Sequence, residues 1–294
     1  MPRLYEYRQA AAAQAGPFLL RTAASGTTTQ ITDTAWPVQS TLPQEMLLRD
    51  YWLYRPQAAL EDRTRLVSGY TPAAGLLTAD RPWSVPPAPG EPYELHGAAP
   101  PEVWHSLINE TLRDCFLVVE FEVQPTEGAI RHSLGTVAPW LTHPAWVRQV
   151  GWREATENRQ EIDPFRRVVR GEAIVQDGAV ILEHPHQVFS ASQRLMVRAV
   201  KPAFFHCRAQ GGTYGEKAGL QNETDEALPA LEWVVAGVLA RYYQRQAALA
   251  PAAQLQEYRN RQAEYAALFS QYARENVVIP PLTFRPLRAW GVPW

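Results

Sequence analysis

The last quarter of the sequence, residues 222–294, constrains the fold most, because apolar residues recur there at helical spacing on both sides of Pro251. A proline drives the preceding residue out of the α region, so Pro251 ends one helix and opens a second. We expect Thr224 or Asp225 to cap the first helix, with Pro229 tolerated in its opening turn. The residues predicted to form the core of a helical bundle, two of them from an earlier helix, are Leu107, Ile108, Leu231, Val235, Val238, Tyr242, Leu255, Tyr258, Tyr265 and Phe269.

A proline-rich tail, residues 276–294, follows the helix pair, and its prolines predict an extended chain. The tail carries large apolar side chains but is too short to form a core of its own. Such side chains dock on the rest of the chain or on another protein, where aromatic anchors dominate binding. The residues predicted to dock on a partner are Pro280, Pro281, Phe284, Arg285, Leu287, Arg288, Trp290 and Trp294.

The overall composition narrows the class of protein. The chain has 294 residues, 46% of them hydrophobic, which is enough to bury a substantial core, and a net charge of −2. A near-neutral chain gives no reason to expect a nucleic-acid or membrane surface. Cys115 and Cys207 are too few for a disulfide framework, which favours a reducing compartment. The N-terminus lacks the layout of a signal peptide and no stretch approaches a membrane span, so we expect a soluble protein made in a cytoplasm.

Helical and β signals alternate along the chain, which predicts an α+β fold: a small helical bundle interrupted by two mainly antiparallel β regions, with an extended C-terminal tail. The clearest hairpin turn is Asp177-Gly178, between two apolar runs. The first helix contains a run of four alanines at 10–13 and has little apolar grip of its own, so we expect it to pack on another element. The predicted segments are an N-terminal helix over 1–17, a β module of about five strands (barrel or sandwich) over 18–98, a bundle helix over 99–115, a second β region over 116–206, a flexible loop over 207–221, the closing helix pair over 222–275 and the docking tail over 276–294.

The glycine-rich stretch 211–220 is the first place to look for a phosphate-binding loop, and it lacks the required pattern. A P-loop needs Gly-Lys-Ser/Thr in succession, whereas Glu216 precedes Lys217 here and Ala218 stands in the hydroxyl position. A carboxylate at that point repels phosphate. We therefore interpret this stretch as a flexible loop ahead of the helix pair.

The remaining candidates for chemistry have simpler explanations. His184 and His186 flank a proline, and no further ligand follows at metal-like spacing, so we interpret them as surface histidines at a strand end. Glu120 and Glu122 lie on one face of a strand, where a solvent face explains them as well as a carboxylate pair does. Neither a nucleophile elbow nor a His-Glu-x-x-His helix occurs. The sequence therefore predicts no catalytic residue, no metal and no cofactor.

Several stretches together resemble a known family. RTAASGTTTQITDTAW, YWLYRP, DRTRLVSGYTPAAGLLTADRPW and GEPYELHG resemble a β module of structural proteins of tailed bacteriophages. The helix VWHSLINETLRD is similar to a helix of such proteins, and DEALPALEWVVAGVLARYYQRQ, together with the helix that follows it, resembles the closing helix pair of neck adaptor (connector) proteins. The resemblance covers most of 18–115 and 222–275, and it is one of pattern, without an invariant catalytic signature.

The resemblance implies a non-enzymatic virion protein, assembled in the host cytoplasm and located in the neck of the particle. In that family a twelve-subunit ring lies coaxial with the portal, continues the DNA channel and presents a platform for the next neck or tail protein. The family's C-terminal segment docks on portal subunits, which here implies 277–294. Near-neutral charge suits a channel through which double-stranded DNA passes without specific binding.

Two alternatives remain open. The β regions make this chain longer than many adaptors, which is compatible with a collar, head-closure or baseplate protein. The ten tryptophans lie mostly in or beside β or extended segments. They are expected to fill β cores, but several exposed on one face would instead indicate a carbohydrate-binding or hydrolytic protein.

Overall fold

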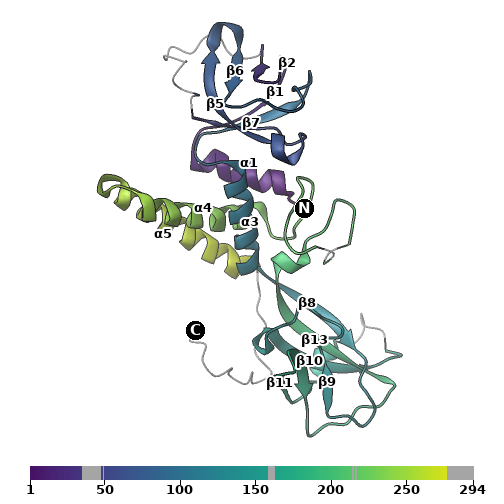
Figure 1. The fold of residues 1–294 in the computed structure, drawn as a ribbon. Coiled ribbons are helices and arrows are strands. Elements are labelled where there is room, and N and C mark those ends of the chain that lie inside the picture. The colour runs from purple at the N-terminus through teal and green to yellow at the C-terminus, as the bar shows by residue number, and fades with distance from the viewer. Residues whose placement is uncertain (35–47, 49, 158–162, 214, 216, 277–294) are drawn as a thin grey trace. The chain divides into compact units, whose positions relative to one another are not determined.

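A computed structural model describes residues 1–34, 48, 50–157, 163–213, 215 and 217–276, and shows helices together with antiparallel sheets (Figure 1). The predicted α+β class is therefore confirmed. The chain divides into two compact units. Unit 1 comprises Met1–Leu112 and Cys207–Ser270, and the described part of unit 2 comprises Arg113–His206 and 271–276.

The β part of unit 1 is one antiparallel sheet with the strand order β1-β7-β4-β5-β6-β3-β2. Short 3-10 helices at Leu60–Asp62 and Pro72–Ala74 lie in its connections. The strands are β1 (Phe18–Thr22), β2 (Ser25–Gly26), β3 (Gln30–Thr32), β4 (Trp52–Tyr54), β5 (Thr64–Thr71), β6 (Leu76–Ala79) and β7 (Pro92–His96).

This sheet closes on itself, because its two outermost strands belong to one continuous segment, 18–26. Between them, the Ala23 amide still donates to Glu91 at 2.9 Å, while the Ala24 amide donates to Thr32 at 2.8 Å. Closure leaves no long free edge. The interior is filled by buried residues of most strands and of their connections: Ala23, Ile31, Leu48, Leu53, Val67, Tyr70, Leu77, Ala79, Trp83, Tyr93 and Leu95. The prediction of about five strands was too low, because strands of two or three residues are too short to show alternation.

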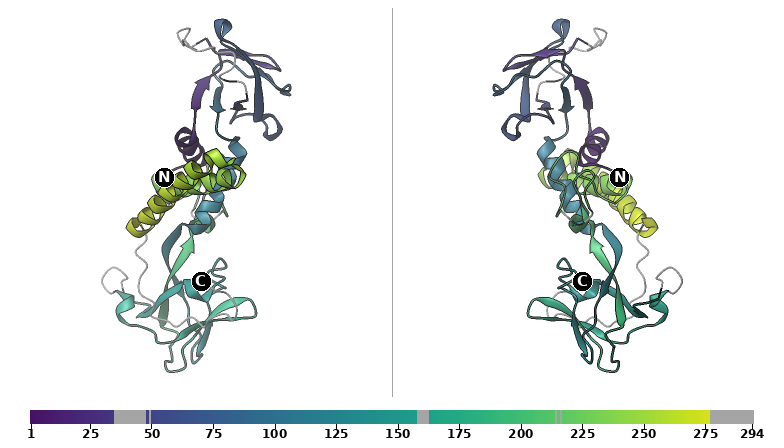
Figure 2. Two further views of the ribbon diagram at one scale, coloured as in Figure 1. Left: turned by 90° about the vertical axis from the view of Figure 1, so that its left-hand side faces the viewer. Right: turned by 90° about the vertical axis from the view of Figure 1, so that its right-hand side faces the viewer.

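The helical part of unit 1 contains α1 (Leu4–Ala15), most of α3 (Pro101–Asp114), α4 (Leu231–Leu249) and most of α5 (Ala252–Asn276), gathered at one end of the closed sheet (Figure 2). Pro251 separates α4 from α5, as predicted. The predicted cap of α4 was wrong, because the helix begins only at Leu231. The Asp225 carboxylate instead accepts hydrogen bonds from the backbone amides of Gln221 and Asn222, each at 2.8 Å. These bonds hold the segment before the helix in a turn.

The first helix packs on other parts of unit 1, as expected for a helix with little apolar grip of its own. Leu4, Tyr7 and Arg8 are buried together with two of the alanines. The first backbone amides of a helix have no partner within it. Here the Leu4 amide donates to the carbonyl of Asp225 at 3.0 Å and the Tyr5 amide to that of Glu223 at 3.3 Å. A distant segment of the chain therefore caps the helix, as expected for a helix that must pack on another element.

Three helices meet at Gly237 in α4. A Cβ at this position would lie 2.5 Å from Thr111 of α3 and 2.7 Å from the Phe269 ring of α5, closer than real contacts allow. Trp104 of α3 packs on Tyr242 of α4 with ring centroids 4.9 Å apart. The missing side chain at Gly237 thus lets α3 and α5 approach α4 on the same side.

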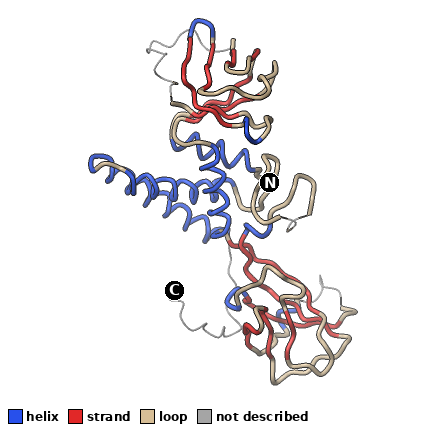
Figure 3. The backbone as a smooth tube through the Cα atoms, viewed as in Figure 1, coloured by secondary structure: helices blue, strands red, loops and turns tan. Residues whose placement is uncertain are grey.

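Unit 2 is built mainly from strands in two three-stranded antiparallel sheets, ordered β10-β13-β8 and β11-β12-β9 (Figure 3). Asp177 and Gly178 form the predicted hairpin turn between β11 and β12, with φ angles of 52° and 78°. The elements are β8 (Phe116–Val123), β9 (Arg131–Ser133), β10 (Val147–Glu154), β11 (Glu172–Gln176), β12 (Ala179–Glu183) and β13 (Gln193–Pro202), with 3-10 helices at Pro144–Trp146, Pro164–Arg166 and Ala203–His206.

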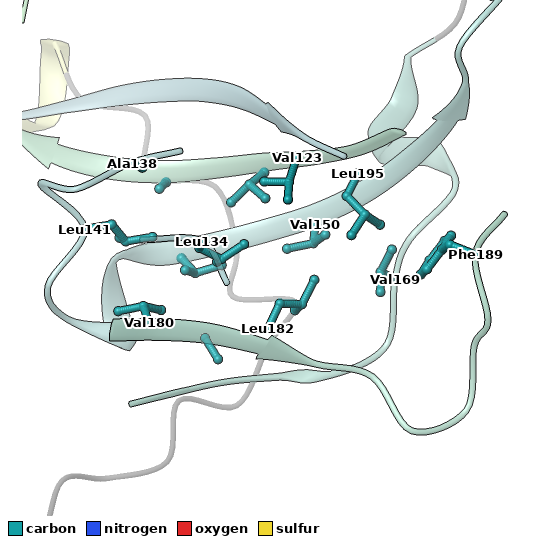
Figure 4. Packing of buried hydrophobic residues seen from close by; sticks show 14 residues of the cluster. Val123, Leu134, Ala138, Leu141, Val150, Val169, Val180, Leu182, Phe189 and Leu195 are labelled. Carbon is teal, nitrogen blue, oxygen red and sulfur yellow. The ribbon is translucent and has the colours of Figure 1, made fainter. Parts of the chain in front are cut away.

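The core of unit 2 draws on both sheets (Figure 4). Val123, Val150 and Leu195 come from the first sheet, and Val180 and Leu182 from the second. Alternate residues of each strand are therefore directed into one shared interior.

Candidate functional site: a buried ionic cluster in unit 1

Arg8 of α1 is the centre of the most unusual arrangement in unit 1, since its side chain is fully buried and charged. Its guanidinium forms a two-pronged contact with Glu94 of β7, in which Nε donates at 3.0 Å and Nη2 at 2.7 Å. Nη1 donates to Oε2 of Glu223, in the segment before α4, at 2.5 Å. The planar guanidinium fork suits such paired contacts, so one side chain joins three parts of the chain.

Other polar groups complete the cluster. The Tyr54 hydroxyl of β4 donates to Oε1 of Glu223, and the Arg8 guanidinium lies 4.6 Å from the centre of the Tyr54 ring. His96 of β7 contacts Glu94 through Nε2 at 2.8 Å, and Gln9 donates to the same carboxylate at 2.7 Å. His105 of α3 lies 2.8 Å from Nη1 of Arg8 through its Nε2 atom. The Arg8 cluster is therefore defined as Arg8, Gln9, Tyr54, Glu94, His96, His105 and Glu223.

These contacts determine which ring nitrogen of each histidine donates and which accepts. Arginine only donates, so Nε2 of His105 accepts and its proton is on Nδ1. An ionised carboxylate only accepts, so Nε2 of His96 donates to Glu94. Nδ1 of His96 is buried and has no hydrogen-bond partner among the described residues. The cluster therefore fixes the orientation of both rings.

Burial and neighbouring charges together lower the pKa values of Glu94 and His105 and raise that of Tyr54. Burial alone would raise the pKa of Glu94, but the His96 hydrogen bond and the Arg8 charge outweigh it and hold that pKa at about 2. Burial, together with the neighbouring Arg8 charge, lowers the pKa of His105 to about 4. Burial raises the pKa of Tyr54. Near neutral pH the cluster thus holds an ionised Glu94, a charged Arg8 and an uncharged His105.

The segment that delivers Glu223 is itself anchored. The side chain of Asn109 in α3 accepts from the Leu220 amide at 2.8 Å and donates to the Leu220 carbonyl at 2.9 Å. Lys217 donates to the buried Asp225 carboxylate at 2.8 Å. The loop predicted to be flexible over 207–221 is therefore pinned at its described C-terminal end, which places Glu223 against Arg8.

The predicted bundle-core residues differ in how deeply they are buried. Leu107, Ile108, Val235, Val238 and Tyr242 are buried. Leu231 and the predicted residues of α5, namely Leu255, Tyr258, Tyr265 and Phe269, are only half-buried. The ring of Tyr265 stacks on that of Tyr243 with centroids 5.7 Å apart, which brings α5 against α4. The residues predicted to dock on a partner, Pro280, Pro281, Phe284, Arg285, Leu287, Arg288, Trp290 and Trp294, lie outside the described residues.

The two histidines interpreted as surface residues differ. His186 is exposed, but His184 is fully buried and stacks on His132 with ring centroids 4.8 Å apart. The surface interpretation of His184 was wrong, because β9 brings His132 over it from a distant part of the sequence. Glu120 and Glu122 are exposed on one face of β8, as the solvent-face interpretation predicted.

The described residues can be compared with the requirements of a metal site and of a membrane span. Among them, no group of three or more His, Cys, Asp or Glu side chains is placed to hold a metal ion. In the same part of the chain, no helix is both long and apolar enough to cross a membrane.

No protein-family model matches the sequence, and no curated protein matches it.

No local sequence pattern predicts the Arg8 cluster. Its members come from five separate segments, between Arg8 and Glu223, and none has the spacing of a known motif. The available hint was an arginine on the apolar side of a short helix, beside Leu4 and Tyr7. The physical role of the cluster is to join α1, α3, the closed sheet and the segment before α4 into one body.

The stability of unit 1 is expected to fall as pH drops from about 6.5 to about 4. The pKa of His105 falls from its ordinary 6.5 to about 4 on folding, so in that range the unfolded chain binds a proton that the folded chain does not. The loss amounts to roughly 2 to 3 kcal/mol. Below its ordinary pKa of 4.5, Glu94 adds a further loss as pH approaches about 2.

Urea unfolding at pH 7 and pH 4.5 tests this expectation. A His105→Gln variant keeps an acceptor for Arg8 but does not titrate, so its stability is expected to change less between the two pH values. His186→Gln, at an exposed histidine, serves as the control and should behave like the unaltered chain. Equal pH dependence in all three proteins would contradict a role for His105.

Proposed function

We propose that this chain is a non-enzymatic structural protein of a tailed bacteriophage, the neck adaptor that forms a ring between portal and tail and continues the DNA channel. The proposal starts from the sequence resemblance of the β module and of the helices before and after it. In its finer form, α1, α3, α4 and α5 are one small bundle into which the two β regions are inserted.

The observation that carries the proposal is the one-sided packing of α5. The helix has 25 residues, and none of the side chains described along it is buried. Its half-buried residues face α4, as the Tyr243–Tyr265 and Trp233–Phe269 ring contacts show, and the other sides are exposed. A helix of this length spans about 37 Å. A closed ring needs two different complementary faces on each subunit, and a long helix with open sides supplies such a face.

The Arg8 cluster supports the same function. A ring subunit must transmit force between its neighbours as one piece, and buried, fully bonded ion pairs hold the helices and the closed sheet in one arrangement. A collar, head-closure or baseplate protein has the same requirement and remains the alternative. The carbohydrate-binding alternative gains no support from the described tryptophans, since none of them is exposed.

The decisive experiment measures the mass of the purified chain alone and mixed with the portal protein of the phage that encodes it. We expect the full chain to join the portal as a ring. A chain truncated after Asn276 should lose at least about tenfold in affinity, because it lacks the apolar anchors. Circular dichroism confirms that the truncated chain remains folded.

The two possible failures are distinct. If the truncated chain joins the portal with unchanged affinity, the tail is not the docking segment, although the adaptor function stands. If the full chain does not join the portal at all, the adaptor function is wrong and a collar or baseplate position becomes the better explanation.

A further inference from the structure

Two buried histidines of unit 2 stack on each other, His132 of β9 and His184 just after β12, with ring centroids 4.8 Å apart and ring planes inclined by 18°. These residues are 4% and 0% exposed. The Phe189 ring, which lies in the core of unit 2, meets the His184 ring edge to face at 5.0 Å (Figure 4). The stacked pair therefore connects β9 to residues 184–189, the segment that carries Phe189 into the core.

Each ring has one hydrogen-bonded nitrogen, and that bond determines where its proton lies. The Gln187 carbonyl only accepts, so Nδ1 of His184, 2.7 Å away, carries the proton. The Thr126 amide only donates, at 3.4 Å, so Nδ1 of His132 is the unprotonated nitrogen. The Nε2 atoms of both rings are buried and have no hydrogen-bond partner among the described residues. Both rings are therefore neutral in this arrangement.

A second proton has no acceptor on either ring. On His184 the proton would go to Nε2, which has no described partner. On His132 it would go to Nδ1, where it would face the N–H group of Thr126. Burying a charge without a partner is costly, and two charged rings stacked at this distance repel each other. Protonation therefore favours the separation of the rings.

The charged groups of the surrounding segments do not offset this cost. Arg131 and Glu183 alternate to the other side of their strands and pair with each other at 2.7 Å. Among the described residues, no ion pair reaches either histidine ring. The charged or titratable residues of the segments around the pair and around Phe189 are Glu127, Arg131, Arg167, Arg170, Glu172, Glu183 and His186, of which Glu127, Arg170, Glu172 and His186 are exposed.

Acid is expected to open this part of unit 2. Burial, together with the neighbouring His184, lowers the pKa of His132 from its ordinary 6.5. If residues 184–189 move away, the His132 ring regains water and its ordinary pKa. Below a pH of about 6.5 the open form then binds more protons than the closed form, so its population rises as pH falls.

We propose that the stacked pair His132–His184 is a pH-sensitive latch of unit 2, which is closed while both rings are neutral and released when they are protonated below neutral pH. Release moves residues 184–189 outwards and withdraws Phe189 from the core. The latch is a local change of charge that acts on a segment with two arrangements. It lies within unit 2, and the inference does not depend on the proposed function.

Hydrogen exchange of the full chain at pH 7.5 and pH 5.5, corrected for the intrinsic exchange rate of each amide, tests the latch. The His184 amide donates to the Ile130 carbonyl at 2.9 Å. Its protection should fall at least about threefold at pH 5.5, because the open form gains protons. The amides of the central strand β13 serve as the internal reference and should keep their protection. Equal protection of the His184 amide at the two pH values would overturn the proposal.

The variant H132N/H184N separates protonation from packing. Asparagine supplies an acceptor for the Thr126 amide and a donor for the Gln187 carbonyl, but it does not titrate. Protection at position 184 should therefore be equal at the two pH values in this variant. His186→Asn, at an exposed histidine, is the control and should retain the loss at pH 5.5. A loss that persists in H132N/H184N would show that other groups open the segment, and would overturn the latch.

A measurement on the unaltered chain keeps the test valid if H132N/H184N fails to fold. The nitrogen chemical shifts of the His132 ring, followed by NMR against pH, report when that ring becomes charged. Charging of His132 should occur over the same pH range as the loss of protection at the His184 amide. A ring that becomes charged while the His184 amide stays protected would mean that protonation does not release the segment.

Discussion

Replacing Arg8 by methionine is expected to lower the free energy of unfolding of unit 1 by about 3 to 5 kcal/mol, the cost of leaving a buried charge without its partner. The variant keeps roughly the volume of the side chain. It leaves the Glu94 carboxylate, which is only 1% exposed, without the arginine charge. It also removes a donor from Glu223 and the contact with the Tyr54 ring. Urea unfolding of the full chain measures the loss, and hydrogen exchange of β7 peptides localises it to unit 1.

A double variant separates charge from packing. In R8M/E94M both members of the buried pair become apolar, and such replacement is often close to neutral. We therefore expect the double variant to be more stable than Arg8→Met alone, although Glu94→Met on its own is destabilising. This non-additivity would show that the cost in Arg8→Met comes from the unpaired carboxylate.

An exposed ion pair in the same unit provides the control. Arg245 of α4 pairs with Glu110 of α3 at 2.7 Å, but its side chain is 47% exposed. Arg245→Met should cost no more than about 1 kcal/mol, because water screens both partners. If Arg8→Met costs as little as Arg245→Met, the buried cluster does not join the parts of unit 1.

Features determined by neighbouring residues were predictable from the sequence. Pro251 separates α4 from α5 because of a steric clash within one dipeptide, and Asp177-Gly178 forms a turn because both residues tolerate positive φ. The stripe of apolar residues along α5 was also predictable from their helical spacing. Its incomplete burial was not, since periodicity shows which residues share a face but not how much of another element covers them.

Features determined by distant residues were not predictable. Glu223 reaches Arg8 across more than two hundred residues, and the same segment caps α1 through its carbonyls. His132 covers His184 only because β9 pairs with β12. In each case a polar or charged residue in the interior is stabilised by a partner whose position depends on the completed fold, and no local pattern encodes that position.

Gly151→Ala is expected to lower the free energy of unfolding of unit 2 by about 3 to 5 kcal/mol, from overpacking, lost backbone hydrogen bonds and exposed apolar surface. A Cβ on Gly151 would lie 2.2 Å from the Pro164 carbonyl oxygen and 2.9 Å from the Phe165 Cα. Both are backbone atoms of the segment 164–169, which covers the outer edge of β10 and is called the covering segment, so this segment must move as a whole. Its displacement breaks the backbone contacts with β10 and withdraws Val169, which is fully buried, from the core.

Gly69→Ala is the matched control, because Gly69 also lies within a strand but its added Cβ would come no closer than 3.7 Å to Thr78. The two substitutions restrict the unfolded chain equally, so the difference in stability between the variants reports the clash alone. Hydrogen exchange at the amides of Trp152 and Val169 should rise sharply in Gly151→Ala and stay unchanged in Gly69→Ala. Protected amides in both variants would mean that β10 accommodates the methyl group, and the covering segment would then be looser than its contacts imply.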